Sequence, residues 1–380
     1  LELSVGPDGV GDRHARPPTI RPRDVSQVTP AMAAACRFGA EGGWAHGVET
    51  PPRGAHRRDE ALSRSALLST RSASWRAKGM RQTRRDGTQG VDWRGVGWFL
   101  AITFGLTYLV EGALILSGFR FGPVSELYGQ LVVAAVMWAP AVGALVTVTR
   151  ITGQSVAALQ VRFAPWRVHL VSALLMPVVY ALIYALTWLL GLGSPDWELS
   201  WFRGIMAEAG ASTDGSPPTG VILGTLFAAS LVLGPTVNGL FGFGEELGWR
   251  GDLLPALMPL GKVRAYLLVG LIWGLWHAPL IAIGFNYPGY PVWGIVAMAG
   301  VTTAFGIYLN EMALRHRSSV LAGWIHGAFN GQAYGIWRLL FPDVNPLLGG
   351  ITGLVGMAVW TAVGLWVATR PEGRAGAALQ

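Results

Sequence analysis

Eight long apolar stretches follow one another after residue 95, and they constrain the fold more than any other feature of the chain. They lie at about 96–117, 128–149, 168–192, 220–243, 263–284, 293–310, 319–341 and 347–369. Most approach the roughly 20 residues that a helix needs to cross a bilayer. Since helices satisfy their own backbone groups in lipid, the pattern predicts an all-α integral membrane protein. We expect about eight transmembrane helices in one bundle with a polar intramembrane cavity.

The overall composition leads to the same class of protein. The chain is 51% hydrophobic and only 13% charged, whereas soluble domains are about 25% charged. One cysteine, Cys36, excludes an internal disulfide framework and a cysteine-rich metal centre. The many glycines and tryptophans suit close helix packing and interfacial belts, and they carry no chemical information of their own.

The N-terminal quarter is a different kind of sequence. Residues 1–94 are rich in Arg, Pro and Gly with little apolar periodicity, so we expect a mostly disordered extension. A basic arm for a lipid surface or nucleic acid is the alternative. The net positive charge would suggest a nucleic-acid partner if it were spread evenly, but sixteen of the 29 Lys and Arg residues precede position 95. We expect the working protein to begin near Met80, with 1–79 an extended gene start. Residues 95–370 then form the transmembrane domain, and 371–380 a short cytoplasmic tail.

The positive charges alternate between successive connectors, which predicts the orientation in the membrane. One set of connectors carries Arg94, Arg150, Arg162, Arg167, Arg250, Lys262, Arg264, Arg315, Arg317 and Arg370, among others, and the opposite set carries only Arg120, Arg203 and Arg338. We therefore expect both termini in the cytoplasm. The high Arg, Ala and Gly content suggests a GC-rich bacterial genome, so the expected location is the inner (plasma) membrane.

Two adjacent acids and an arginine end the fourth apolar stretch. Glu246 and Arg250 are four residues apart and can pair on one helix face. Glu245 is about 100° away around the helix, so it faces elsewhere and is free to act. Taken alone, these residues could equally be a charge cluster that caps a membrane span.

Two later stretches carry imidazole and amide groups at helical spacing. His277 lies inside the fifth stretch one turn after Trp273, and Pro279 can free a backbone carbonyl nearby. His326 and Asn330 are four residues apart in the seventh stretch, so both side chains point the same way. Two N–H donors on one face can hold an oxyanion. Taken alone, each group also fits a hydrogen-bonded structural role.

Together these groups predict a hydrolytic site inside the membrane. Ionisable side chains are costly at that depth and usually have a function. Glu245 and His277 can polarise a water for attack on a peptide carbonyl, while His326 and Asn330 stabilise the tetrahedral oxyanion. No serine or cysteine nucleophile is required, and no cofactor or metal is expected.

The ordered motifs resemble those of a known family. Glu-Glu-x-x-x-Arg, aromatic-x-x-x-His and His-x-x-x-Asn on successive spans are similar to the CPBP intramembrane proteases, which include type II CAAX prenyl endopeptidases and bacteriocin self-immunity proteins. The resemblance covers roughly residues 220–335 and implies an all-helical fold with a cavity open to the cytoplasmic side. It implies a glutamic-type endopeptidase in which Glu245 and His277 activate water, His326 and Asn330 form the oxyanion hole, and Glu246 and Arg250 shape the site. Trp273 stands where phenylalanine is usual.

Other functions stay open at this point. Glu245, His277 and His326 could bind zinc, although no His-Glu-x-x-His motif favours it. A proton-coupled transporter also buries ionisable groups, and Glu111, deep in the first stretch, would suit either a buried hydrogen bond or a substrate contact. A non-catalytic immunity or scaffold protein is a third alternative. The expected partner is a membrane-bound protein or peptide, and whether it is prenylated is not predicted.

Overall fold

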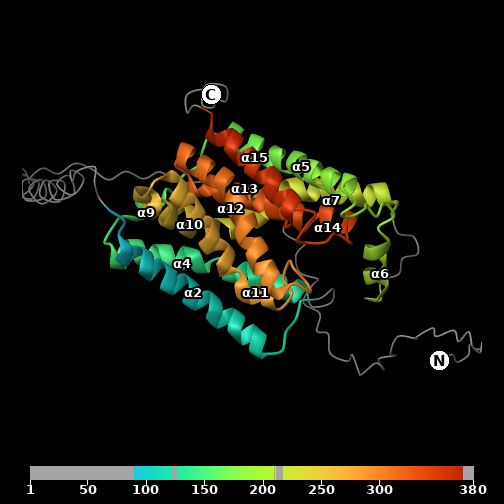
Figure 1. Ribbon diagram of the computed structural model, residues 1–380, viewed down its shortest axis with the longest axis horizontal. Coiled ribbons are helices and arrows are strands. Elements are labelled where there is room, and N and C mark those ends of the chain that lie inside the picture. Colours follow the sequence, from blue (N-terminus) through green and yellow to red (C-terminus); the bar gives the residue numbers. More distant parts are fainter. Residues whose placement is uncertain (1–89, 122–125, 209, 211–216, 371–380) are drawn as a thin grey trace, which may run out of the picture. The chain divides into compact units, whose positions relative to one another are not determined.

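The computed structural model describes residues 90–121, 126–208, 210 and 217–370. The predicted disordered extension before residue 90, its start near Met80 and the cytoplasmic tail after 370 lie outside the described residues. The described part of the chain is helical and holds no strand, so the predicted all-α membrane fold is confirmed (Figure 1). Its elements are α2 (Trp93–Leu116), α3 (Glu126–Val136), α4 (Ala139–Val146), α5 (Trp166–Leu189), α6 (Ser200–Glu208), α7 (Thr219–Leu233), α8 (Gly239–Gly248), α9 (Leu254–Leu257), α10 (Lys262–Trp276), α11 (Ala278–Ala282), α12 (Pro291–His316), α13 (Ser319–Ala333), α14 (Ile336–Leu340) and α15 (Leu354–Ala368).

All eight predicted stretches coincide with helical segments, but the described helices differ in length. Five are long and apolar enough to cross a membrane: Trp93–Leu116, Tyr128–Ile151, Trp166–Leu189, Thr219–Leu260 and Pro291–His316. The apolar helix α15 is shorter. Membrane helices in this part of the chain are therefore established by length and composition, and the number eight stays a prediction.

The fourth stretch continues well past the point where the sequence predicted its end. α7, α8 and α9 run without a break from Thr219 to Leu260, joined by wider π turns at Gly234–Asn238 and Trp249–Leu253. Glu245 and Glu246 therefore lie inside a helix, and about 20 Å of helix separates them from Leu260 at 1.5 Å per residue. π turns often occur at functional sites.

The fifth stretch is interrupted where the histidine lies. α10 ends at Trp276, and α11 starts with Pro279 in its first turn. Proline has no N–H to offer the carbonyl four residues earlier, and that carbonyl, of Leu275, accepts a hydrogen bond from the Tyr108 hydroxyl at 3.0 Å. The break leaves His277 at a helix end.

Glycines bring the helices of the first and third motifs into direct contact. A Cβ atom built at Gly327 of α13 would lie 2.1 Å from the backbone nitrogen of Gly239 in α8, and one at Gly323 would lie 2.6 Å from Phe243 Cα. Such close approach is how membrane helices pack without large side chains. The contact brings the two acids on α8 alongside His326 on α13.

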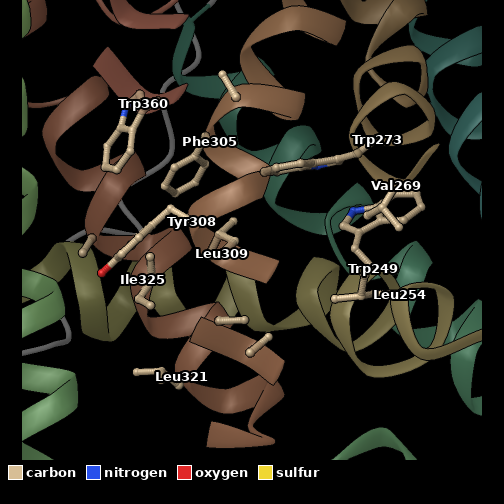
Figure 2. Close-up of a cluster of buried hydrophobic side chains, with 14 of the residues drawn as sticks. Trp249, Leu254, Val269, Trp273, Phe305, Tyr308, Leu309, Leu321, Ile325 and Trp360 are labelled. Atoms are coloured by element: carbon tan, nitrogen blue, oxygen red, sulfur yellow. The ribbon is translucent and has the colours of Figure 1, made fainter. Parts of the chain in front are cut away.

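An aromatic core lies beside this helix pair. Figure 2 shows Trp273, Phe305 and Trp360 in one cluster of buried side chains, with Trp249 near Trp273. The rings of Phe305 and Trp360 meet edge to face, with centroids 4.8 Å apart. α12 supplies Phe305, so this long helix joins α10 to α15 and supports the site from behind.

Candidate active site

The buried carboxylate of Glu246 is the hub of a network that links two of the predicted motifs. Its Oε1 lies 2.9 Å from an Arg250 guanidinium nitrogen and 2.9 Å from Nδ1 of His326. Arg250 also donates from Nε to the Asn310 side-chain oxygen at 3.0 Å. Neither the Glu246 nor the Arg250 side chain is exposed. Opposite charges can remain in such a dry place only when they are paired and hydrogen-bonded.

Glu245 points to a different set of partners, as its place on the helix predicted. Its Oε2 accepts a hydrogen bond from the Trp273 indole at 2.6 Å and one from the Trp249 indole at 3.3 Å. No hydrogen bond involving the second carboxylate oxygen is found among the described residues. The two indoles thus hold the carboxylate in one orientation and leave its Oε1 available as a proton acceptor.

Trp273 is the side chain around which the motifs gather. The Arg250 guanidinium carbon lies 4.4 Å from the centre of the indole, a cation–π arrangement. The His326 ring meets the indole edge to face at 5.4 Å, and His277 lies 6.2 Å away. The sequence predicted that Trp273 lies one turn before His277, but it did not predict the hydrogen bond to Glu245.

The histidine at the end of α10 has a defined proton arrangement. His277 Nδ1 lies 2.9 Å from the backbone carbonyl oxygen of Trp273. A carbonyl can only accept a hydrogen bond, so Nδ1 carries the proton. In a neutral ring, Nε2 is then left with a lone pair. Such a nitrogen can take a proton from water.

A cavity of about 340 Å³ reaches these groups. His277, His326 and Asn330 all line it, as does Trp273. Glu245 is 2% exposed, accepts the hydrogen bond from the Trp273 indole and lies within electrostatic range of His326. The structure therefore brings three of the four predicted catalytic side chains to one cavity and puts the fourth close to His326.

Two residues of the site went unpredicted. Trp249 lies between the acids and Arg250 in sequence, and Asn310 is fully buried in α12. An amide at the end of an apolar stretch, as Asn310 is, is an available signal, because polar groups within membrane helices usually have a function. Nothing in the spacing of Asn310 pairs it with Arg250, which lies 60 residues away.

The alternative of a zinc site receives no support from the gathered side chains. Among the described residues, no group of three His, Cys, Asp or Glu side chains lies close enough to hold a metal ion. Nδ1 of His277, Nδ1 of His326 and Oε2 of Glu245 already make hydrogen bonds within the protein.

Comparison with known proteins points to one family. Residues 225–332 match the family described as "Type II CAAX prenyl endopeptidase Rce1-like". Over 83 residues, 20% of its length, the chain is 32% identical to "CAAX prenyl protease 2" of Methanococcus maripaludis and spans 30% of that relative. The matched segment contains all seven predicted site residues. Over this segment the chain is similar to CAAX proteases, and the resemblance predicted from its motifs is confirmed.

Proposed function

We propose that this protein is a CAAX-type intramembrane endopeptidase that hydrolyses a peptide bond of a membrane-associated substrate. The observation that carries the proposal is the gathering of two imidazoles and an amide at one cavity, with the Glu245 carboxylate hydrogen-bonded to Trp273 of its wall and close to His326. The match of residues 225–332 to a protease family supports the same activity.

In this proposal, Glu245 and His277 activate the attacking water. The Glu245 oxygen that the indoles leave unengaged and the Nε2 lone pair of His277 are both proton acceptors. A water between them loses a proton as it attacks the peptide carbonyl, and the proton then passes to the leaving amine. A positioned general base of this kind contributes about 10²–10⁴ in rate.

His326 and Asn330 stabilise the oxyanion in this proposal. Nδ1 of His326 faces Glu246 Oε1 at 2.9 Å, so the donor available to substrate is Nε2–H. A ring with protons on both nitrogens is an imidazolium, and the carboxylates of Glu245 and Glu246 beside it stabilise that charge. Asn330 lies one turn further along α13 and offers its amide N–H to the same oxygen.

Glu246, Arg250 and Asn310 support this arrangement without touching the substrate. The ion pair holds His326 in place through Glu246, and Asn310 holds Arg250 under the Trp273 ring. Breaking one partner of such a buried pair leaves an uncompensated charge, which costs about 3–5 kcal/mol.

The substrate class follows from the walls of the cavity. Aromatic side chains line much of it, including Trp273, Phe305 and Phe329. An extended peptide with an apolar side chain or a lipid modification suits such walls. The substrate is therefore a membrane-bound protein or peptide, and prenylation is the modification that the family name suggests.

The test is comparative C-terminal proteomics of membranes from cells that carry the wild-type protein or Glu245→Gln. We expect a set of membrane proteins whose C-termini are trimmed only with the wild type. A synthetic peptide of the best substrate, with and without its prenyl group, then measures the contribution of the lipid. Identical C-termini in the two membranes would contradict a peptidase that depends on Glu245.

A further inference from the structure

His277 lies at a break between two helices, so its position depends on what holds the chain on either side. α10 ends at Trp276, and Pro279 lies in the first turn of the short helix α11. A proline at such a place removes a backbone hydrogen bond and lets the two helices tilt against each other. On the α10 side, the Trp273 carbonyl fixes Nδ1 of His277 at 2.9 Å. A contact on the α11 side is needed to fix the histidine completely.

Backbone hydrogen bonds join His277 to the connector that follows α11. The His277 carbonyl accepts from the Ile281 N–H at 3.1 Å, and the Leu280 carbonyl accepts from the Phe285 N–H at 3.0 Å. Asn286 follows with φ 57°, in the left-handed region that asparagine tolerates better than most residues. The chain between His277 and Asn286 is thus a compact, hydrogen-bonded turn. A displacement of Asn286 is therefore passed on to the histidine.

Tyr334 has a similar relation to Asn330 on the other side of the cavity. Its backbone N–H donates to the Asn330 carbonyl at 3.0 Å, where α13 ends. Tyr334 and Asn286 both line the cavity that also contains His277 and Asn330. Each of the two catalytic groups at the helix ends therefore has a neighbour at the edge of the same cavity.

The two edge residues are bonded to each other. The Tyr334 hydroxyl donates to the side-chain oxygen of Asn286 at 3.1 Å. The Tyr334 ring also stacks on Phe285, with centroids 6.3 Å apart and planes 28° from parallel. These contacts connect α11 to the end of α13.

A second contact joins α10 and α13 on the far side of the catalytic residues. The rings of Trp273 and His326 meet edge to face at 5.4 Å. Along α10 and α11, His277 lies between Trp273 and the Asn286 connector, and along α13, Asn330 lies between His326 and Tyr334. The base and the oxyanion donor are thus held between two contacts.

We propose that Asn286 and Tyr334 are positioning residues whose hydrogen bond sets the distance between His277 and Asn330 during attack on the peptide carbonyl. The inference rests on the proposed function, because this distance matters only if both residues act on one carbonyl. A misplacement of about 1 Å can lower a catalytic rate about 100-fold. Since Asn286 and Tyr334 act through His277 and Asn330, their bond contributes to kcat and not to substrate binding.

Single side-chain changes in the full chain test the proposal. Tyr334→Phe removes the hydroxyl and keeps the ring that stacks on Phe285. Asn286→Gly removes the amide and keeps a residue that adopts positive φ without strain, whereas Asn286→Asp retains an oxygen that accepts the bond. Tyr290→Phe is the matched control. Tyr290 belongs to the same connector, but its hydroxyl accepts a hydrogen bond from the side chain of Asn345 at 3.2 Å, in a segment without predicted catalytic residues.

Steady-state kinetics on a peptide substrate and thermal unfolding in detergent are measured for each variant. We expect Tyr334→Phe and Asn286→Gly each to lower kcat by about 2–10-fold at unchanged KM, since a hydrogen bond contributes about that much. The double variant should lose no more than either single variant, because both remove the same bond. Asn286→Asp and Tyr290→Phe should cleave like the wild type.

Four results would overturn the positioning role. Wild-type kcat in both single variants, with or without a lower Tm, would show that the bond does not affect the chemistry. A raised KM with unchanged kcat would identify a substrate contact instead. Losses that multiply in the double variant would show two independent effects, and an equal loss in Tyr290→Phe would show that any loosening of the connector suffices. If the wild-type protein cleaves no peptide at all, the proposed function fails, and this inference fails with it.

Discussion

At the scale of single residues, Trp273 carries the largest difference from what the sequence could predict. Its place one turn before His277 predicted only that both side chains lie on one helix face. The 2.6 Å hydrogen bond to Glu245 joins residues 28 positions apart and depends on the packing of two helices. Helical spacing does predict the Glu246–Arg250 pair, which is local, and the structure contains that pair at 2.9 Å.

We predict that Trp273→Phe lowers kcat by about 10–100-fold with little change in KM, because a hydrogen bond to a charged group contributes about 1.5–3 kcal/mol. Trp360→Phe is the matched control, since Trp360 is also buried and its indole nitrogen lacks a partner among the described residues. Steady-state kinetics on a peptide substrate measure both variants. Equal losses in the two would show that only packing matters at Trp273.

A second residue-scale prediction concerns Glu111. The sequence left it as a buried hydrogen-bonding group or a substrate contact, yet its carboxylate oxygens find no partner in the described part of the chain. An unsatisfied buried polar group costs about 1–3 kcal/mol. We expect Glu111→Leu to raise the Tm in detergent. A lower Tm would mean that Glu111 stabilises the fold.

At the scale of helices, the sequence predicted which stretches are helical but not where several of them end. Apolar length identified every stretch, since lipid forces the backbone to bond within each helix. It could not predict that the helix Thr219–Leu260 continues through two π turns. In the sequence, the charged residues around Arg250 resemble the end of a membrane span. Nor could it predict that α15 begins at Leu354, after turns that include Gly350 at φ 63°.

The element-scale prediction tests the contact between α8 and α13. Gly327→Ala adds a Cβ where the Gly239 backbone lies. We therefore expect the free energy of unfolding to fall by about 1–3 kcal/mol or more, with a lower Tm and loss of cleavage. Gly105→Ala in α2 is the control, because a Cβ there meets nothing within 4 Å. Thermal unfolding in detergent compares the two. If both variants unfold at the wild-type temperature, the helices do not meet as closely as described.

At the scale of the whole molecule, the described helices bring His277, His326 and Asn330 to one cavity and hold the Glu245 carboxylate beside its Trp273 wall. We predict that strong chelators leave cleavage unchanged, because the protein supplies its own proton acceptors and oxyanion donors. Cleavage after dialysis against 1,10-phenanthroline and EDTA measures this, with a zinc peptidase as the control. Loss of activity that added zinc restores would require a metal mechanism.

The most direct test of the central claim is the cleavage rate of Glu245→Gln in proteoliposomes, beside a matched exchange far from the cavity. Glu208→Gln, at an exposed position of α6, provides that control. Removing the base should lower the rate by at least about 100-fold, while the control cleaves like wild type and both variants keep the wild-type Tm. A folded Glu245→Gln protein that cleaves at the wild-type rate would contradict water activation by this carboxylate.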